Sequence, residues 1–129
     1  NDVREDEIVI GVVPKDGKVL MICRAKQEGK LLWAFPGGKV EKNETREEAC
    51  IREVKEETSV EVSIKTIIGI REHPDTGRKI TYFLCGYLAG FPKVVNSAET
   101  SQVLFMSKDE FMQCVTSDVF PPVLTALQW

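Results

Sequence analysis

The chain of 129 residues is 43% hydrophobic and 29% charged, and its formal net charge is -3. This length predicts one domain over residues 1–129, and no apolar run approaches the ~20 residues of a membrane-spanning helix, which excludes a membrane partner. A slightly acidic chain without a basic tract also argues against polymeric nucleic acid, whose binding needs clustered Lys and Arg.

The cysteines and the N-terminal residues bear on the cellular compartment. The four cysteines form no C-x-x-C pair, so they indicate neither a zinc motif nor a redox motif, and we expect reduced thiols. Residues 1–6 are acidic where a secretory signal would be basic and then apolar. The sequence therefore favours a cytoplasmic protein.

The first third of the chain predicts strands followed by a loop. Residues 8–14 and 18–23 are β-rich, and the dipeptide Asp16-Gly17 between them suits a tight turn, so we expect them to pair as a hairpin. A short apolar stretch over residues 31–35 ends at Pro36-Gly37-Gly38, where the chain must leave regular structure.

A helix is predicted over residues 45–58, because Thr45 can cap its first turn and Glu48 stands three residues on, as a capping box requires. Beyond it, residues 60–71 and 79–88 are β-rich and flank a turn-forming cluster, which predicts neighbouring antiparallel strands. A short strand is expected over 103–106. Two further helices are expected over 108–115 and 121–128.

The predicted helix carries three carboxylates on one face. Glu53, Glu56 and Glu57 stand at i, i+3 and i+4, so they lie within about one turn of each other. Cys50 and Val54 fall on the other side and can pack the helix against a sheet. One face therefore anchors the helix, and the other can face a cleft.

Clustered hard oxygen ligands suit Mg²⁺, for which Mn²⁺ can substitute, and they indicate phosphate chemistry. A metal there would neutralise phosphate charge, while a spare carboxylate accepts the proton of an attacking water. The neighbouring Arg52 can hold a glutamate in position by a forked ion pair. Taken alone, the same pattern is also that of a solvated surface helix.

The residues around the helix match a longer motif. Gly38 is followed after five residues by Glu44, and after seven more by Arg52-Glu53-Val54, then Glu56-Glu57 and Ser59-Val60. This resembles the Nudix box, G-x5-E-x7-R-E-U-x-E-E-x-G-U with U aliphatic. Such a match arises by chance in roughly one chain in 10⁵ of this length.

One position departs from the box, because Ser59 stands where the motif has glycine. A glycine would suit the left-handed residue that often ends a helix. Serine adopts that conformation at a cost of about 1 kcal/mol. Since no carboxylate is missing, we expect a slightly altered helix end and retained chemistry.

The resemblance extends to most of the chain. Residues 33–41 are similar to the segment that leads into the box in MutT-type members, and Phe120-Pro121-Pro122 is similar to a piece near their C-terminus. The family fold implied is an α/β/α sandwich with a mixed β-sheet.

The resemblance also implies roles for individual residues. Glu53, Glu56 and Glu57 would be metal ligands, with one of them or a neighbour as general base, and Glu44 would assist at the edge of the site. Gly37 or Gly38 would offer a backbone carbonyl to a metal. Further residues expected at the site are Arg24, Lys39 and, in a late loop, Glu99, of which the first two meet phosphate charge or are solvated surface cations.

The expected base pocket departs from that of the MutT enzymes that act on oxidised guanine nucleotides. Those enzymes place an asparagine shortly after Phe-Pro-Pro to read the purine, whereas here Leu124 stands in that region. A leucine cannot make those hydrogen bonds. Phe35, Leu124, Phe120 and Trp33 are expected either to line a base pocket or to belong to the core.

The resemblance therefore implies a Mg²⁺-dependent hydrolase that cuts a phosphoanhydride bond in a nucleotide, first of all a nucleoside triphosphate. The alternative substrates are ADP-ribose and dinucleoside polyphosphates. A third hypothesis is a nucleotide-binding sensor without turnover, against which the intact glutamates argue. The partner is a nucleotide, and the protein is expected to be a monomer or a homodimer.

Overall fold

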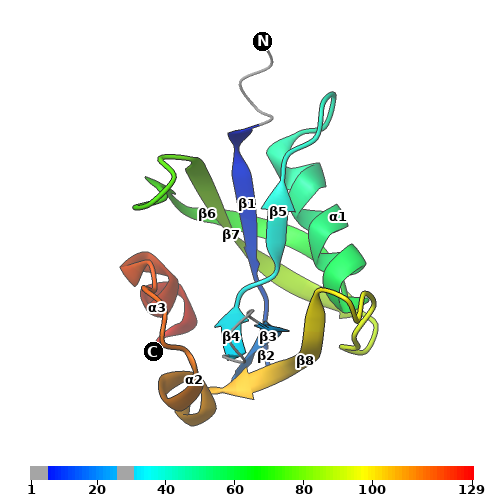
Figure 1. Ribbon diagram of the computed structural model, residues 1–129, viewed down its shortest axis with the longest axis vertical. Coiled ribbons are helices and arrows are strands. Elements are labelled where there is room, and N and C mark those ends of the chain that lie inside the picture. The colour runs from blue at the N-terminus through cyan, green and yellow to red at the C-terminus, as the bar shows by residue number, and fades with distance from the viewer. Residues whose placement is uncertain (1–5, 26–30) are drawn as a thin grey trace.

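Two β-sheets form the centre of the molecule (Figure 1), for which a computed structural model describes residues 6–25 and 31–129. The first sheet has the strand order β5-β1-β7-β6, and the second joins β2, β3, β4 and β8. β1 runs parallel to β7, whereas its pairing with β5 and the pairing of β6 with β7 are antiparallel. The strands are β1 (Ile8–Val12), β2 (Pro14–Lys15), β3 (Lys18–Ala25), β4 (Leu31–Ala34), β5 (Gly37–Lys39), β6 (Glu61–Glu72), β7 (Lys79–Ala89) and β8 (Thr100–Ser107).

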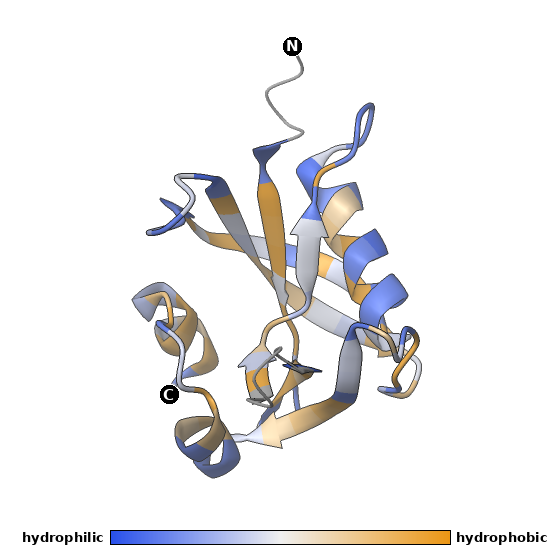
Figure 2. Cartoon of the chain, viewed as in Figure 1, coloured by the Kyte–Doolittle hydropathy of each residue, from blue (hydrophilic) through white to orange (hydrophobic). Residues whose placement is uncertain are grey.

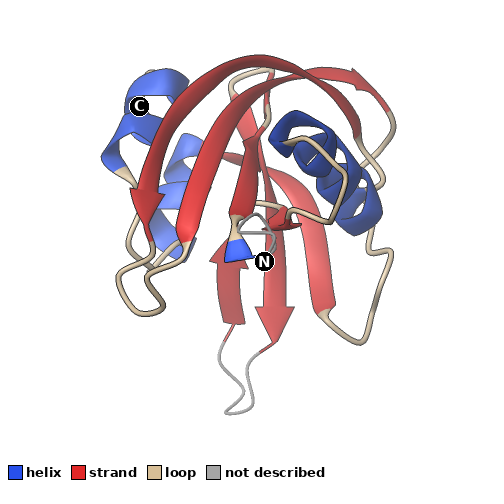
Figure 3. Cartoon of the chain, turned by 90° about the horizontal axis from the view of Figure 1, so that it is seen from above, coloured by secondary structure: helices blue, strands red, loops and turns tan. Residues whose placement is uncertain are grey.

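Helices lie on both faces of the first sheet, as Figure 3 shows from above, with α1 (Arg46–Thr58) on one face and α3 (Pro121–Leu127) on the other, while α2 (Lys108–Cys114) packs beside β8 of the second sheet. α1 buries Cys50 and Val54 against the face that carries Phe83. Residues of α2 and α3 belong to the hydrophobic cluster that includes Tyr82 on the other face. The expected mixed sheet between helices is confirmed.

The central strand β1 separates two hydrophobic clusters. Val9 packs in the cluster under α1, whereas Ile10 packs against the cluster that includes α2 and α3. Figure 2 shows hydrophobic residues along this strand. A strand covered on both faces is apolar throughout, as its sequence is.

The predicted hairpin is wrong in its extent. Residues 8–12 do not pair with β3; they lie between β5 and β7 in the first sheet. Only Pro14–Lys15 pairs with β3, across a turn in which Asp16 and Gly17 have φ values of 52° and 77°. The turn at Asp16-Gly17 is present as predicted. The apolar strand β1, however, packs on both faces and pairs on both edges in the middle of the first sheet.

The loop expected at Pro36-Gly37-Gly38 is wrong in part, because Gly37–Lys39 forms the short strand β5 by pairing with β1. The other elements agree closely with expectation. Thr45 and Glu48 form the predicted capping box, and β6 and β7 pair as antiparallel neighbours. α2 and α3 end at Cys114 and Leu127, each one residue before the predicted end. β8 begins three residues before the predicted strand, because antiparallel pairing with β3 extends to the polar residue Thr100. No helix of the described residues is long and apolar enough to cross a membrane.

A buried carboxylate ties three elements together at one end of the first sheet. Glu7 precedes β1, and its Oε1 accepts from Arg46 Nη2 at 2.8 Å and lies 3.3 Å from Lys79 Nζ. Burial alone would raise the pKa of the Glu7 carboxyl, but the hydrogen bonds and charges of Arg46 and Lys79 outweigh it and lower the pKa. The ionised form is therefore favoured by folding.

Glu7→Gln is expected to lower the free energy of unfolding at pH 7 by about 1–3 kcal/mol, the scale of a lost hydrogen bond to a charged group. Folding lowers the pKa of Glu7, so the Glu7 carboxylate stabilises the folded protein above the pKa of the unfolded chain, about 4.3. This stabilisation is lost as the pH falls through the lower pKa of the folded protein. Urea unfolding at pH 7 and at pH 3.5 measures this. The difference between parent and variant should shrink at low pH, and Glu72→Gln, at an exposed strand end, should change little. An equal difference at both pH values would contradict the assignment.

Candidate active site

The acidic face of α1 opens onto a hollow of about 710 Å³. Glu53 and Glu57 are mostly buried there, with side chains 18% and 17% exposed, whereas Glu56 is 57% exposed at the rim. Eight of the site residues that the sequence predicts line this hollow; Glu44, Arg52, Phe35 and Leu124 do not. The hollow is lined by Arg24, Gly37, Gly38, Lys39, Glu53, Glu56, Glu57, Val95, Asn96, Glu99 and Thr100.

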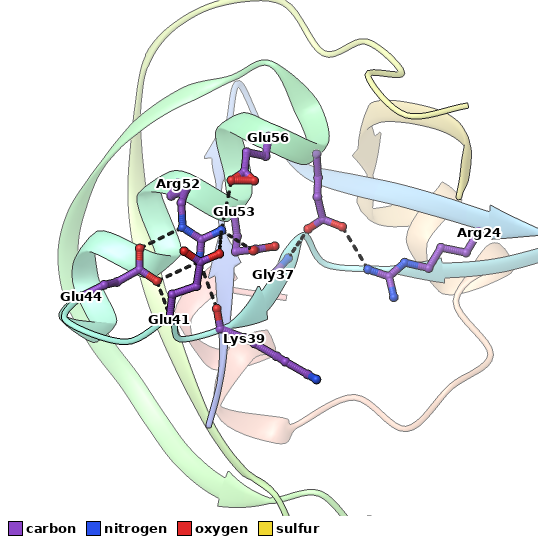
Figure 4. A network of polar contacts seen from close by, with 9 residues as sticks. Arg24, Gly37, Lys39, Glu41, Glu44, Arg52, Glu53 and Glu56 are labelled. Carbon is purple, nitrogen blue, oxygen red and sulfur yellow. Dashed lines mark hydrogen bonds and ion pairs between the residues drawn. The ribbon is translucent and has the colours of Figure 1, made fainter. Parts of the chain in front are cut away.

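Arg52 organises one side of this face (Figure 4). Its Nε and Nη2 donate to the two carboxylate oxygens of Glu44, each at 2.8 Å, which is the predicted forked pair. Its Nη1 donates to Glu53 at 2.6 Å and to Glu56 at 3.1 Å. The hydrogen bonds from Arg52 lower the pKa of Glu44. Arg52 therefore keeps Glu44 ionised and holds Glu53 and Glu56 side by side.

Glu57 is fixed by a different set of partners. The backbone N–H of Gly37 donates to its Oε1 at 2.7 Å, and Arg24 Nη2 donates to its Oε2 at 3.0 Å. Arg24 comes from β3 and is about half exposed. The Arg24 guanidinium lines the hollow and is already paired with the Glu57 carboxylate. That Arg24 contacts phosphate stays a prediction.

Gly37 and Gly38, the first glycine of the box, both lie where other groups approach the backbone closely. A Cβ on Gly37 would collide with the backbone oxygen of Val9 in β1, and a Cβ on Gly38 would collide with the carboxylate of Glu53. Gly38 thus lets the Glu53 carboxylate lie directly against β5. Ser59 ends α1 in the left-handed conformation, with φ of 70°, and its N–H donates to Lys55 O at 2.9 Å. The helix end is retained despite the missing glycine.

The carboxylates of α1 lie close together and repel one another, and a bound cation would relieve this repulsion. Burial raises the pKa of Glu53, the hydrogen bond from Arg52 opposes this, and the charges of Glu57 and Glu56 add to the rise. Burial likewise raises the pKa of Glu57, against the Gly37 N–H and Arg24, with Glu99 adding to the rise. The donor set therefore fits a hard divalent cation.

The carboxylates do not form a closed metal cage by themselves. Among the described residues, no three acidic or other ligating side chains converge on one point. The charge of Glu53 and Glu56 is instead met by Arg52, and that of Glu57 by Arg24. Binding a cation here requires these arginines to share or release the carboxylates.

A second cavity of about 390 Å³ lies on the other side of the chain segment that enters β5. Ala34 and Phe35 line it, and Gly37, two residues further on, lines the acidic hollow. Trp33 and Phe120 line it as well, so three of the four residues proposed for a base pocket meet there. Leu124 instead packs against the hydrophobic cluster behind it and is not among the lining residues.

Two charged residues in this second cavity are absent from the sequence-based prediction. Arg71 Nη1 donates to Asp118 Oδ2 at 2.8 Å, and Arg71 Nε donates to Tyr82 Oη at 3.2 Å. The guanidinium lies over the rings of Tyr82 and Phe120, at 5.7 and 5.3 Å from their centroids. No local signal could find this pair, since its members are 47 residues apart.

Comparison with known proteins gives consistent matches. The family model of the NUDIX domain matches residues 5–124. The CTP pyrophosphohydrolase of Escherichia coli (strain K12) is 28% identical over 93% of this chain and 89% of that protein. The ADP-ribose pyrophosphatase of Methanocaldococcus jannaschii is 45% identical, but over 52% of this chain and only 40% of that protein. The solution structure of the E. coli ORF135 protein has a TM-score of 0.72 and 26% identity, covering 95% of this chain and 89% of that chain.

Proposed function

This chain belongs to the NUDIX family, and from that premise we propose that it hydrolyses a phosphoanhydride bond of a nucleoside triphosphate to give a nucleoside monophosphate and pyrophosphate. The observation that carries the proposal is the acidic face of α1, where Glu53, Glu56 and Glu57 all face one hollow. On a solvated helix face, Glu53 and Glu57 would not be mostly buried, nor would the Glu53 carboxylate lie where a Cβ on Gly38 would stand. The single domain over residues 1–129 is part of this proposal.

The metal would be held by Glu53, Glu56 and Glu57, with the Gly38 carbonyl and Glu99 as further ligands. Mg²⁺ is the first choice and Mn²⁺ a substitute, because the donors are hard oxygens. When bound, such a cation supplies charge neutralisation at the phosphates and makes nearby water more acidic.

The chain's own groups perform the remaining tasks. Arg24 and Lys39 line the hollow and bind phosphate oxygens by charge. Arg52 keeps the glutamates in place from behind. One of the α1 carboxylates accepts the proton of the attacking water, a role for which a buried carboxyl with a raised pKa is suited.

The second cavity gives the nucleoside a place next to the phosphates. Its walls are aromatic and apolar, as base pockets are. Phe35 of this cavity and Gly37 of the acidic hollow are two residues apart in the chain, which supports placing the base and the phosphates of one nucleotide in the two spaces. The triphosphate is favoured over ADP-ribose because the CTP-cleaving relative aligns over nearly its whole length, whereas the ADP-ribose-cleaving relative aligns over less than half of its own.

A panel of substrates with Mg²⁺ tests the proposal. Nucleoside triphosphates are expected to release pyrophosphate, detected by a coupled pyrophosphatase, faster than ADP-ribose or dinucleoside polyphosphates are cleaved. Faster cleavage of ADP-ribose, which the 45% identity to an ADP-ribose pyrophosphatase favours, would move the assignment to that substrate. Binding of nucleotides without any turnover would support the sensor hypothesis instead.

Discrimination between oxidised and normal guanine nucleotides is expected to be weak. Leu124 has no amide to read a purine edge and packs, partly buried, against a hydrophobic cluster. The comparison is kcat/KM for 8-oxo-dGTP against dGTP. A preference above roughly a thousandfold would require hydrogen-bonding readout and would contradict this expectation.

A further inference from the structure

We propose that the 390 Å³ cavity selects cytosine nucleotides, through hydrogen bonds from the base to the Arg71–Asp118 pair. The inference rests on the proposed function, in that the cavity is taken to hold the base of the substrate. It concerns which base is chosen and by which side chains.

Arg71 is held rigidly enough to read a base. Its Nε–H donates to Tyr82 Oη, and one Nη1–H donates to Asp118 Oδ2. The flat guanidinium also lies over the rings of Tyr82 and Phe120. The Phe120 ring in turn lies 4.8 Å from the Tyr82 ring and against Gly69, where a Cβ would come within 3.0 Å of it. A planar group fixed in this way loses little freedom when it binds a second partner.

The hydrogen-bonding groups that remain have a definite order. A guanidinium has five N–H donors, of which these two are engaged, so three remain for a ligand within the described surroundings. Asp118 Oδ1 remains as an acceptor beside them. The pair therefore presents one acceptor followed by two or more donors.

This order matches the pairing edge of cytosine. Cytosine offers the N4 amino group as donor and then N3 and O2 as acceptors, so Asp118 can take the amino group while Arg71 donates to N3 and O2. Uracil has an acceptor, O4, where the carboxylate needs a donor. Guanine offers one acceptor and two donors, and the second donor would compete with Arg71 for the engaged oxygen of Asp118. Adenine offers its N6 amino group and the acceptor N1 but has a C–H where cytosine has O2, so it meets Asp118 and only one Arg71 donor. Cytosine is therefore the base that pairs with the carboxylate and with two guanidinium donors without breaking the ion pair.

Equilibrium binding of CMP and UMP, measured by calorimetry, tests the inference without requiring turnover. The parent is expected to bind CMP about 10-fold or more tightly than UMP, the scale of one good base contact at a partly exposed site. Asp118→Asn should lower this CMP/UMP ratio about 10-fold, because a carboxamide can donate to uracil O4. Asp75→Asn is the matched control: it removes a charge from the exposed turn that borders the cavity, and should leave the ratio unchanged.

The steady-state ratio of kcat/KM for CTP and UTP should follow the binding ratio in all three proteins. Equal affinity of the parent for CMP and UMP, or an unchanged ratio in Asp118→Asn, would overturn the inference even if triphosphates are cleaved. Absence of triphosphate cleavage, with the CMP preference and its loss in Asp118→Asn intact, would overturn the proposed function and leave the base assignment standing.

Discussion

Glu57→Gln and Glu53→Gln are each expected to lower kcat by about 100-fold or more, the scale of a lost electrostatic or acid–base contribution. Glutamine keeps the size and the helix propensity of glutamate but removes the negative charge that a cation or a proton would meet. Both carboxylates are mostly buried at the hollow, so water cannot easily replace them. The measurement is kcat with saturating Mg²⁺ on the best triphosphate of the panel.

The same variants should fold normally. The pKa values of Glu53 and Glu57 are raised by folding, so their charges oppose folding at neutral pH, and a neutral side chain should leave the free energy of unfolding equal or slightly higher. Glu47→Gln is the control, since this exposed glutamate lies on the first turn of α1, away from the hollow. Parental kcat in both Gln variants would make the acidic stripe a solvated surface and the proposed chemistry wrong.

Val54→Asp is expected to destabilise the protein by several kcal/mol and to unfold much of the population. Val54 is fully buried on the anchoring face of α1, and a Cβ built on Gly11 of β1 would lie 2.6 Å from it, so no space exists for water around a new charge. An unpaired buried carboxylate has a cost of this size.

The matched control for Val54→Asp is Ile51→Asp on the same helix. Ile51 is 37% exposed, so a carboxylate there remains hydrated and the expected loss is below about 1 kcal/mol. Circular dichroism during urea unfolding compares the two variants with the parent. Similar stability of both variants would mean that α1 is not anchored through Val54.

The parts of the fold that could be predicted from the sequence are those with local signals. Thr45 and Glu48 mark the start of α1 by side chains only three residues apart, and the spacing of Glu53, Glu56 and Glu57 is set by helix geometry alone. The position of β1 depends instead on which distant strands it pairs with. The β-rich composition of residues 8–14 and the turn at Asp16-Gly17 could not decide between β3 and β7 as the partner of β1.

In the candidate site, too, residues close together in the sequence could be predicted and contacts between distant residues could not. Gly38, Glu53, Glu56 and Glu57, which lie within 20 positions of each other, line one hollow, whereas the pairing of Arg24 with Glu57 spans 33 residues and joins β3 to α1 by a contact that no local pattern indicates. Arg71 and Asp118 resemble ordinary surface charges in the sequence. They acquire a specific arrangement in the fold, where the rings of Tyr82 and Phe120 lie against the Arg71 guanidinium and Asp118 accepts from it. Leu124 stands close to Phe120 along the chain, but α3 turns it away from the cavity, where it packs partly buried against the hydrophobic cluster.

The most direct test of the central claim, that the α1 carboxylates work through a divalent cation, is turnover of the best triphosphate with Mg²⁺ and then with excess chelator. We predict that pyrophosphate release stops when the chelator exceeds the metal and returns when Mg²⁺ is added back, because crowded hard oxygen donors need a hard cation. Undiminished turnover in excess chelator would contradict the account.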